Sequence, residues 1–229
     1  NGENPPSGAN ISYYLKEKQK DSVEVFVYNQ KNELIQTIKA TNKPGVQRVY
    51  WDLRHQDFVL PKLVTKPKGK DWVPLNDKGE RNLFIPDLDI GPGLTPTLVP
   101  PGTYSIVLKI GQKEWKQSLP VLKDPNTKAT EEMIAKQYQQ GIRLYTTINT
   151  TLKMIGEMEK IRASLLKDPK NKSAVTLEEK LHQLESKLFD MNQTGARWDI
   201  FRSGGQLLER FLAQGKEGII SSADNSPTE

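Results

Sequence analysis

The sequence of 229 residues predicts a mixed α+β protein, in which an antiparallel β-sandwich is followed by an α-helical hairpin or bundle. Two observations support this prediction. Residues 1–124 contain several short segments with apolar residues at alternate positions and no helical pattern between them. After residue 125 the apolar residues recur every three or four positions, which is the period of a helix. We therefore expect two domains, 1–124 and 125–229.

The strands of the first part are predicted from alternation and from the turn residues that separate them. Val23, Val25 and Val27 show the period of two most clearly. Gly111-Gln112 suits a two-residue hairpin, because glycine adopts a positive φ without strain. The predicted strands are Ile11 to Leu15, Val23 to Tyr28, Glu33 to Ala40, Gln47 to Asp52, Gly102 to Ile110 and Lys113 to Leu119.

Residues 55–101 form a long proline-rich loop within the expected sandwich. The loop holds eight of the fifteen prolines, a density that no helix or central strand accepts. Loops of this length are uncommon in small domains and are usually functional, disordered or packed against a neighbour. Its apolar residues predict partial packing: Phe58, Leu63, Trp72, Leu83, Phe84 and Ile85.

Three helices are predicted in the second part. Thr130 can cap the first helix, which continues to about residue 167. The second is predicted to begin at the capping box that Thr176 opens, and the third at a similar spacing that begins with Ser203.

The first two helices are expected to pair through facing apolar stripes, as in a coiled-coil hairpin. The stripe of the first helix comprises Ile134, Tyr138, Gly141, Tyr145, Ile148, Leu152 and Ile155. The stripe of the second comprises Leu177, Leu181, Leu184, Leu188 and Met191. This pairing predicts that Leu184 is buried.

The two ends of the chain suggest a segment of a longer protein. The sequence starts without methionine, and its last residues, Ser226-Pro227-Thr228-Glu229, are typical of a helix start. We therefore expect the helical part to be truncated at its C-terminus.

Composition excludes several classes of function. The chain has no cysteine, which removes disulfides, thiolate metal sites and cysteine nucleophiles. No apolar run approaches the roughly 20 residues of a membrane span. The net charge of +5 is a small surplus in a mixed pattern, which does not favour nucleic-acid binding.

No catalytic, cofactor or metal site is predicted. His55 and His182 have neither a nucleophile motif nor a metal-ligand spacing around them, so surface or packing roles are favoured. Asp87 and Asp89 are the nearest to a pair of catalytic carboxylates or Ca²⁺ ligands. Because aspartate before glycine and proline is common in turns, the turn interpretation is preferred. We expect the isolated chain to have no hydrolytic activity.

Two tryptophan motifs are candidates for ligand contact. Trp51-Asp52-Leu53-Arg54 at a strand end is interpreted as a core tryptophan with an ion pair, and alternatively as a ligand pocket. Trp72, next to Asp71, is the better candidate for stacking on a sugar, because an exposed ring offers an apolar face.

Two lysine runs are candidates for phosphate contact, but neither has an aromatic platform beside it. Solvated side chains are therefore predicted for Lys16, Lys18, Lys20, Lys66, Lys68 and Lys70.

The order of several short motifs resembles the C-terminal region of bacterial sortilin-like proteins, which are large secreted or envelope β-propellers with BNR/Asp-box repeats, often labelled glycosyl hydrolases. The motifs are the segments 5–15, Trp51-Asp52-Leu53-Arg54, Pro100-Pro101-Gly102-Thr103-Tyr104, Lys123-Asp124-Pro125 and 195–202. The strand part is also similar to the immunoglobulin-like domain of flagellar hook-cap proteins. That similarity implies an immunoglobulin- or fibronectin III-like sandwich, with structural roles for Trp51, Asp52, Arg54, Gly102 and Tyr104.

The resemblance implies a bacterial protein that is secreted, periplasmic or attached to the envelope. No Asp-box occurs in this chain, so the hydrolase label does not extend to these residues. We expect a non-catalytic accessory module that braces or presents a β-propeller of the same or an associated protein. The alternatives are a carbohydrate-binding module attached to a polysaccharide-acting glycosidase, and a hydrolase fragment.

Overall fold

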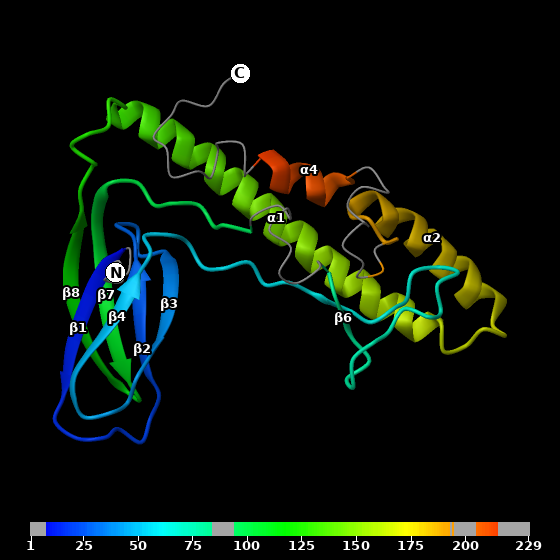
Figure 1. Cartoon of the computed structure of the whole chain (residues 1–229), viewed down its shortest axis with the longest axis horizontal. Coiled ribbons are helices and arrows are strands. Elements are labelled where there is room, and N and C mark those ends of the chain that lie inside the picture. Colours follow the sequence, from blue (N-terminus) through cyan, green and yellow to red (C-terminus); the bar gives the residue numbers. More distant parts are fainter. Residues whose placement is uncertain (1–7, 84–93, 193, 195–204, 215–229) are drawn as a thin grey trace, which may run out of the picture. The chain divides into compact units, whose positions relative to one another are not determined.

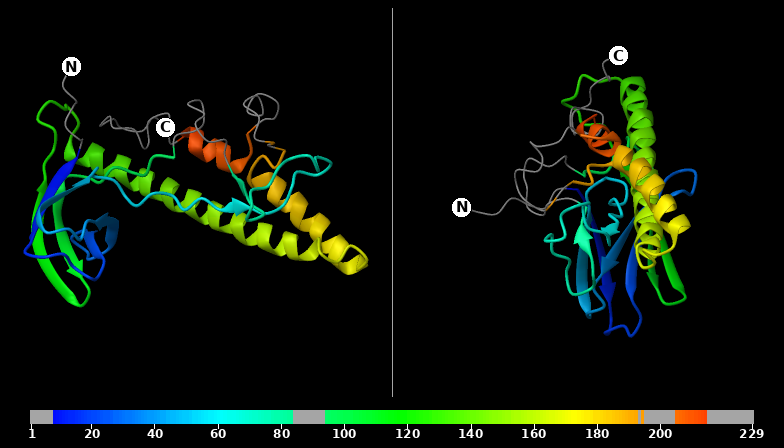
Figure 2. Two further views of the ribbon diagram at one scale, coloured as in Figure 1. Left: turned by 60° about the horizontal axis from the view of Figure 1, so that its bottom comes forward. Right: turned by 90° about the vertical axis from the view of Figure 1, so that its right-hand side faces the viewer.

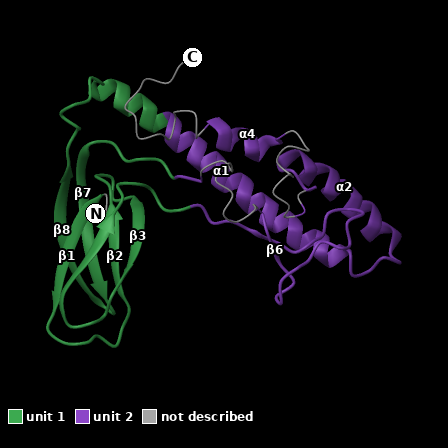
Figure 3. Cartoon of the chain, in the orientation of Figure 1, with its two compact units in different colours: residues 1–57, 96–139, 222–229 green, residues 58–95, 140–221 purple. Residues whose placement is uncertain are grey.

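The computed structural model describes residues 8–83, 94–192, 194 and 205–214. It contains antiparallel β-sheets and α-helices, so the predicted mixed α+β class is confirmed (Figure 1). The chain forms two compact units, which are residues 1–57, 96–139 and 222–229 (unit 1) and residues 58–95 and 140–221 (unit 2) (Figure 3). Most of the proline-rich segment therefore clusters with the helices.

Unit 1 holds two antiparallel sheets, and all six predicted strands are present, two with the predicted ends and four with shifted ends. The larger sheet has the strand order β3-β2-β7-β8, and the smaller sheet pairs β1 with β4. The strands are β1 (Ala9–Leu15), β2 (Val23–Tyr28), β3 (Leu34–Ala40), β4 (Gly45–Trp51), β7 (Gly102–Ile110) and β8 (Lys113–Val121).

The two sheets of unit 1 share a hydrophobic core. Val25 and Val27 of β2 are fully buried, as their alternation predicted. They form one cluster with Trp51 at the end of β4 and with Tyr104 and Ile106 of β7. A residue from each sheet therefore contributes to the same apolar layer, which is how two antiparallel sheets stabilise each other.

Two glycines permit close backbone approaches in unit 1. Gly111 joins β7 to β8 with φ of 57°, and a side chain there would run into the Asp21 carboxylate. Gly8 has φ of 109°, and a side chain there would run into the Trp51 carbonyl. The positive φ predicted for the hairpin is confirmed at Gly111.

The Trp51-Asp52-Leu53-Arg54 motif forms a tight corner after β4. Trp51 is only 1% exposed, and its indole Nε1 donates a hydrogen bond to the Arg54 carbonyl at 2.9 Å. The Asp52 carboxylate accepts the Arg54 N–H at 3.1 Å, while the Arg54 guanidinium donates to the Pro96 carbonyl at 2.7 Å. Leu53 has a positive φ of 62° in this corner.

Unit 2 is built on the long helix α1 (Glu131–Leu165), whose first residues belong to unit 1. Thr130 caps α1 through a hydrogen bond from the Met133 N–H to its hydroxyl at 3.2 Å, as predicted. The helices α2 (Lys172–Leu188) and α4 (Leu207–Gln214) lie along α1 (Figure 2). The short strands β5 (Lys62–Leu63) and β6 (Arg81–Asn82) complete the unit.

The core of unit 2 joins the helices to the proline-rich segment. Ile148, Leu152 and Ile155 of α1 are nearly inaccessible to solvent, which confirms the predicted stripe in this part of the helix. The other buried members of the cluster are Phe58, Leu63, Leu83, Leu144, Phe189, Met191, Leu208 and Leu212. Phe84 and Ile85 lie outside the described residues.

The predicted start of the second helix is wrong, and its apolar seam is wrong at Leu177 and Leu184. Helix α2 begins earlier, after Asn171, whose side chain accepts the N–H groups of Ser173 and Ala174. Leu177 and Leu184 are 47% and 54% exposed, so this part of the stripe does not face α1, whereas Leu188 and Met191 at its end do pack in the core with α1. The buried positions of α2 are Ala174 and Glu185, because a polar network occupies this interface.

The two leucines of this correction give a paired test. We expect Leu184→Ala to change the free energy of unfolding by less than about 0.5 kcal/mol, the usual range for a surface substitution. Leu152→Ala, at a position only 1% exposed, should lower it by about 2–5 kcal/mol. Urea unfolding of both variants measures the difference, and equal losses would contradict the observed orientation of α2.

Candidate functional site

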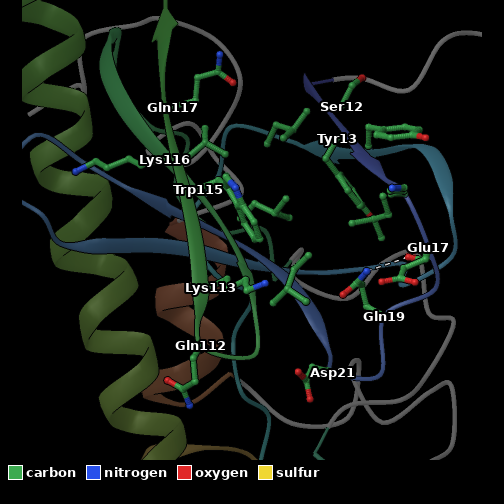
Figure 4. Close-up of a pocket in the computed structure, with 17 residues that line it drawn as sticks. Ser12, Tyr13, Glu17, Gln19, Asp21, Gln112, Lys113, Trp115, Lys116 and Gln117 are labelled. Carbon is green, nitrogen blue, oxygen red and sulfur yellow. Dashed lines mark hydrogen bonds between the residues drawn. The ribbon is translucent and has the colours of Figure 1, made fainter.

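A groove opens between β1 and β8 in unit 1, with a volume of about 770 Å³ (Figure 4). Its floor is made by apolar residues of β7, namely Ile106, Leu108 and Ile110. One wall is β1 and the first turn after it, and the other wall is β8. Trp115 of β8 extends into the space between the walls (Figure 4).

The groove results from a difference in width between the two sheets. Tyr13 and Leu15 of β1 pack against Val23 of β2 and Ile110 of β7. In the described part of the chain, β1 pairs with β4 alone. Strand β4 contacts β3, which is the edge strand of the larger sheet farthest from β8. The two-stranded sheet therefore reaches across β2 and part of β7, and β8 extends beyond its edge.

Strand β8 is exposed on both faces over most of its length. Every residue of 113–118 is exposed, whereas Leu119 nearer the core is half-buried. Because Leu108 is opposite Trp115 in the β7–β8 register, the Trp115 side chain projects from the inner face of the sheet. Trp115 is nevertheless 51% exposed, so an inner sheet face here meets solvent.

The end of the groove near the β1–β2 turn is rich in lysine. Lys16 and Lys113 line this end, and Lys18 and Lys20 lie in the same turn. Within the described residues no ion pair involves any of these four lysines. Glu17 and Asp21 also line the groove, so the surplus of positive charge is modest.

A second cluster of chemically active side chains is buried in unit 2. Glu159 of α1 and Glu185 of α2 are both 0% exposed, and Arg162 of α1 lies between them. Nη1 of Arg162 is 3.2 Å from Oε1 of Glu159 and 2.8 Å from Oε2 of Glu185. Its other edge binds Oε1 of Glu178 at 2.8 and 3.0 Å.

This cluster also holds the proline-rich segment. Oε2 of Glu159 accepts the backbone N–H groups of Val64 and Thr65 at 2.6 and 2.8 Å. Oε1 accepts the Thr65 hydroxyl at 2.6 Å, and Arg81 of β6 donates to the Thr65 carbonyl at 2.9 Å. The Glu159 carboxylate therefore holds residues 64–65 against α1, and the Thr65 carbonyl links the same residues to β6.

Burial shifts the acidity of two groups in the cluster. Loss of hydration, with a further effect from the charge of Glu159, raises the pKa of Glu185 to about 7. Burial and then the positive charge of Arg162 lower the pKa of His182, whose Nδ1 lies 3.0 Å from Nη2 of Arg162. Oε1 of Glu185 is buried without a hydrogen-bond partner in the described part of the chain.

The geometry assigns this cluster a structural role. Two carboxylates near a histidine resemble acid–base groups, but an inaccessible carboxylate cannot reach a substrate. Within the described residues, no group of three or more His, Asp or Glu side chains is placed to hold a metal ion. The cluster instead provides the paired and hydrogen-bonded surroundings that buried charges require.

The residues predicted to contact ligands are dispersed. Trp72 is 70% exposed in unit 2, and among the described residues no aromatic ring lies against it. Asp71 beside it accepts a hydrogen bond from Lys66 at its carbonyl. Lys70 donates to the Asn192 carbonyl at 2.7 Å. Asp87 and Asp89 lie outside the described residues.

His55 lies in unit 1, is half-buried and packs against Tyr138. Its Nε2 is 3.0 Å from the Tyr138 hydroxyl, and the two rings stack with centroids 5.9 Å apart. Burial lowers the pKa of His55, although the charge of Glu33 acts in the opposite direction. Both histidines therefore pack against neighbouring side chains.

Sequence reasoning did not single out Trp115, Glu159, Arg162 or Glu185. The signal for Trp115 was its place at an inward position of a short predicted strand with charged neighbours. The signal for the network was that the apolar stripe of α1 continues, after Ile155, with Glu159 and Arg162 at helical spacing.

A comparison with protein-family models, curated proteins and solved structures finds no match. Among the described residues, no helix has both the length and the hydrophobicity to span a membrane.

The buried network makes a strong prediction for Arg162. The substitution Arg162→Met leaves two buried carboxylates without their shared cation. The free energy of unfolding should therefore fall by about 3–5 kcal/mol. Lys160→Met on the exposed side of the same helix is the matched control and should change stability little. If both variants unfold at the same urea concentration, the network does not stabilise unit 2.

Glu185 makes a prediction about pH. Its pKa of about 7 in the folded chain lies above the ordinary value of 4.5, so the folded state holds the proton more tightly. The contribution of Glu185 to stability should therefore fall as pH rises from about 4.5 to about 7, by up to about 3 kcal/mol, and stay constant above that.

Urea unfolding of the parent and of Glu185→Gln over this pH range isolates the effect. The groups that face Glu185 are retained in both proteins, and they are Glu159, Arg162, Glu178, His182 and Arg81. The parent should lose stability relative to the variant as pH rises. A difference that grows in the opposite direction would contradict the raised pKa.

Proposed function

We propose that this chain is a non-catalytic interaction module of a larger secreted or envelope bacterial protein, and that the β1–β8 groove binds its protein partner. The observation that carries the proposal is the exposed inner face of β8, with Trp115 51% exposed above an apolar floor. Inner sheet faces are normally covered in a folded domain, so an uncovered one indicates a contact surface.

The proposed fold of the strand part is an immunoglobulin- or fibronectin III-like β-sandwich. In support, the Tyr104 hydroxyl donates to the Pro100 carbonyl, four residues upstream, at 2.7 Å. This is the arrangement of a tyrosine corner, a feature of that fold. Tyr104 also packs edge-on against Trp51, with ring centroids 5.2 Å apart. These contacts support the structural roles proposed for Trp51 and Tyr104.

The partner we propose is a β-propeller of the same or an associated protein. This identity comes from the resemblance of the sequence motifs to the C-terminal region of sortilin-like proteins. The groove adds a surface through which such a module braces or presents a partner. The inaccessible carboxylates Glu159 and Glu185 support the non-catalytic part of the proposal, since each is already bound to a neighbouring group.

A second candidate function is carbohydrate binding. The observation in its favour is that Trp115 offers an exposed ring beside polar Gln112 and Gln117, and all three line the groove. Sugar rings stack on such faces while neighbouring amides bind their hydroxyl groups. The earlier candidate for stacking, Trp72, lies in unit 2 without a second aromatic ring against it in the described residues.

Photo-crosslinking distinguishes the two functions. A benzophenone amino acid replaces Trp115 in the intact protein, made in its natural host, and the crosslinked product is identified by mass spectrometry. We expect a crosslink to a polypeptide. The same substitution at Trp72, which is 70% exposed, should give no crosslink to that polypeptide. A crosslink only to glycan at position 115, with weakened oligosaccharide binding in Trp115→Ala, would favour carbohydrate binding instead.

A further inference from the structure

We infer that the groove binds one extended segment of the partner protein, which adds as a strand to the edge of β1 that no strand of the described residues occupies. This inference rests on the proposed function and specifies how the partner binds. A strand beside β1 would lie about 4.8 Å from it, over the uncovered inner face of β8. It would widen the two-stranded sheet on the side where the groove is open.

The composition of the edge strands favours β1 as the site of addition. Sheets protect their free edges with charged residues, proline or bulges, because unpaired backbone groups recruit other strands. In unit 1, β3 contains Lys39, β4 contains Arg48 and β8 contains Lys116 and Pro120. The seven residues of β1, ANISYYL, contain neither charge nor proline.

The side chains around β1 determine which residue types suit each position of the bound segment. Alternate residues of an added strand point toward the floor of the groove. There they would meet Leu108 of β7 and the ring of Trp115, so apolar or aromatic residues suit these positions. The remaining positions face outward, next to exposed Ser12 and Tyr14 of β1, and accept polar residues.

The lysines at one end of the groove favour an acidic residue at the corresponding end of the bound segment. Lys16 follows the last residue of β1, and Lys113 begins β8 opposite Ile110. Ile110 packs with Leu15, so both lysines are at the same end of the groove. An acidic residue at this end of the segment would pair with these lysines, which have no ion pair among the described residues.

Synthetic peptides test the inference on the full chain. The probe is a peptide of about nine residues with alternating valine and threonine, carrying two glutamates at one end. Two versions, with the glutamates at the N-terminus or at the C-terminus, separate antiparallel from parallel addition to β1. A third version carries lysines in place of the glutamates, and a fourth has N-methyl groups at alternate backbone nitrogens, which removes the strand hydrogen bonds.

Variants of the chain assign binding to the groove. Trp115→Ala should weaken binding of the better acidic peptide by about tenfold. Trp72→Ala, the same substitution at an exposed tryptophan of unit 2, should leave it unchanged. Lys113→Glu should reverse the preference between acidic and lysine peptides, whereas Lys136→Glu on α1 should not. Amide hydrogen exchange in β1 should slow when the acidic peptide binds.

Each outcome decides the inference. Binding by an acidic peptide, its loss on N-methylation, and slower exchange in β1 support strand addition. If the photo-crosslink at position 115 reaches a protein but no peptide slows exchange in β1, strand addition is wrong and the proposed interaction module stands. If sedimentation shows a dimer that Trp115→Ala dissociates and the peptides do not, the occupant of the groove is a second copy of this chain and the inference is overturned.

Discussion

A mismatch in width between two packed sheets determines the arrangement of unit 1. The smaller sheet has two strands, and the sheet it faces has four. Residues of β1 and β4 must bury the Val25 and Val27 side chains of β2, which are fully inaccessible. Because both strands of the smaller sheet pack on this part of the core, they leave residues 113–118 of β8 exposed. The exposed Trp115, the groove and an edge of β1 that no other described strand pairs with all follow from this single constraint.

Unit 2 solves a different problem, which is to order a proline-rich segment that can form little sheet or helix of its own. Proline lacks the backbone donor that regular structure uses, so such a segment depends on side chains for its hydrogen bonds. Glu159 supplies acceptors to Val64 and Thr65, and Arg162 links that carboxylate to Glu185 of α2. Buried charge here provides directional contacts, which apolar packing alone does not supply.

The sequence allowed the strands and the long helix to be predicted because their signals are local. Alternation of valines in β2 and the Thr130 cap depend only on neighbouring residues. The face of α2 could not be predicted this way. Its leucines at heptad spacing favoured an apolar seam, but the buried face carries Glu185, whose burial depends on Arg162 and Thr65 from distant positions. Trp115 was missed for a related reason, since its exposure depends on the width of the opposite sheet.

The two units differ in how much hydrogen-bonding and charge capacity remains available to a ligand. In unit 2, Arg162 binds three glutamates at once, and little of its hydrogen-bonding capacity remains for a ligand. Along the groove of unit 1, lysines without ion pairs in the described residues lie beside an apolar floor and an uncharged strand edge. Backbone groups at a strand edge contribute to affinity without regard to sequence, whereas the floor and the lysines discriminate between side chains. Selectivity for one partner segment would therefore come from Trp115 and Lys113, and its affinity largely from β1.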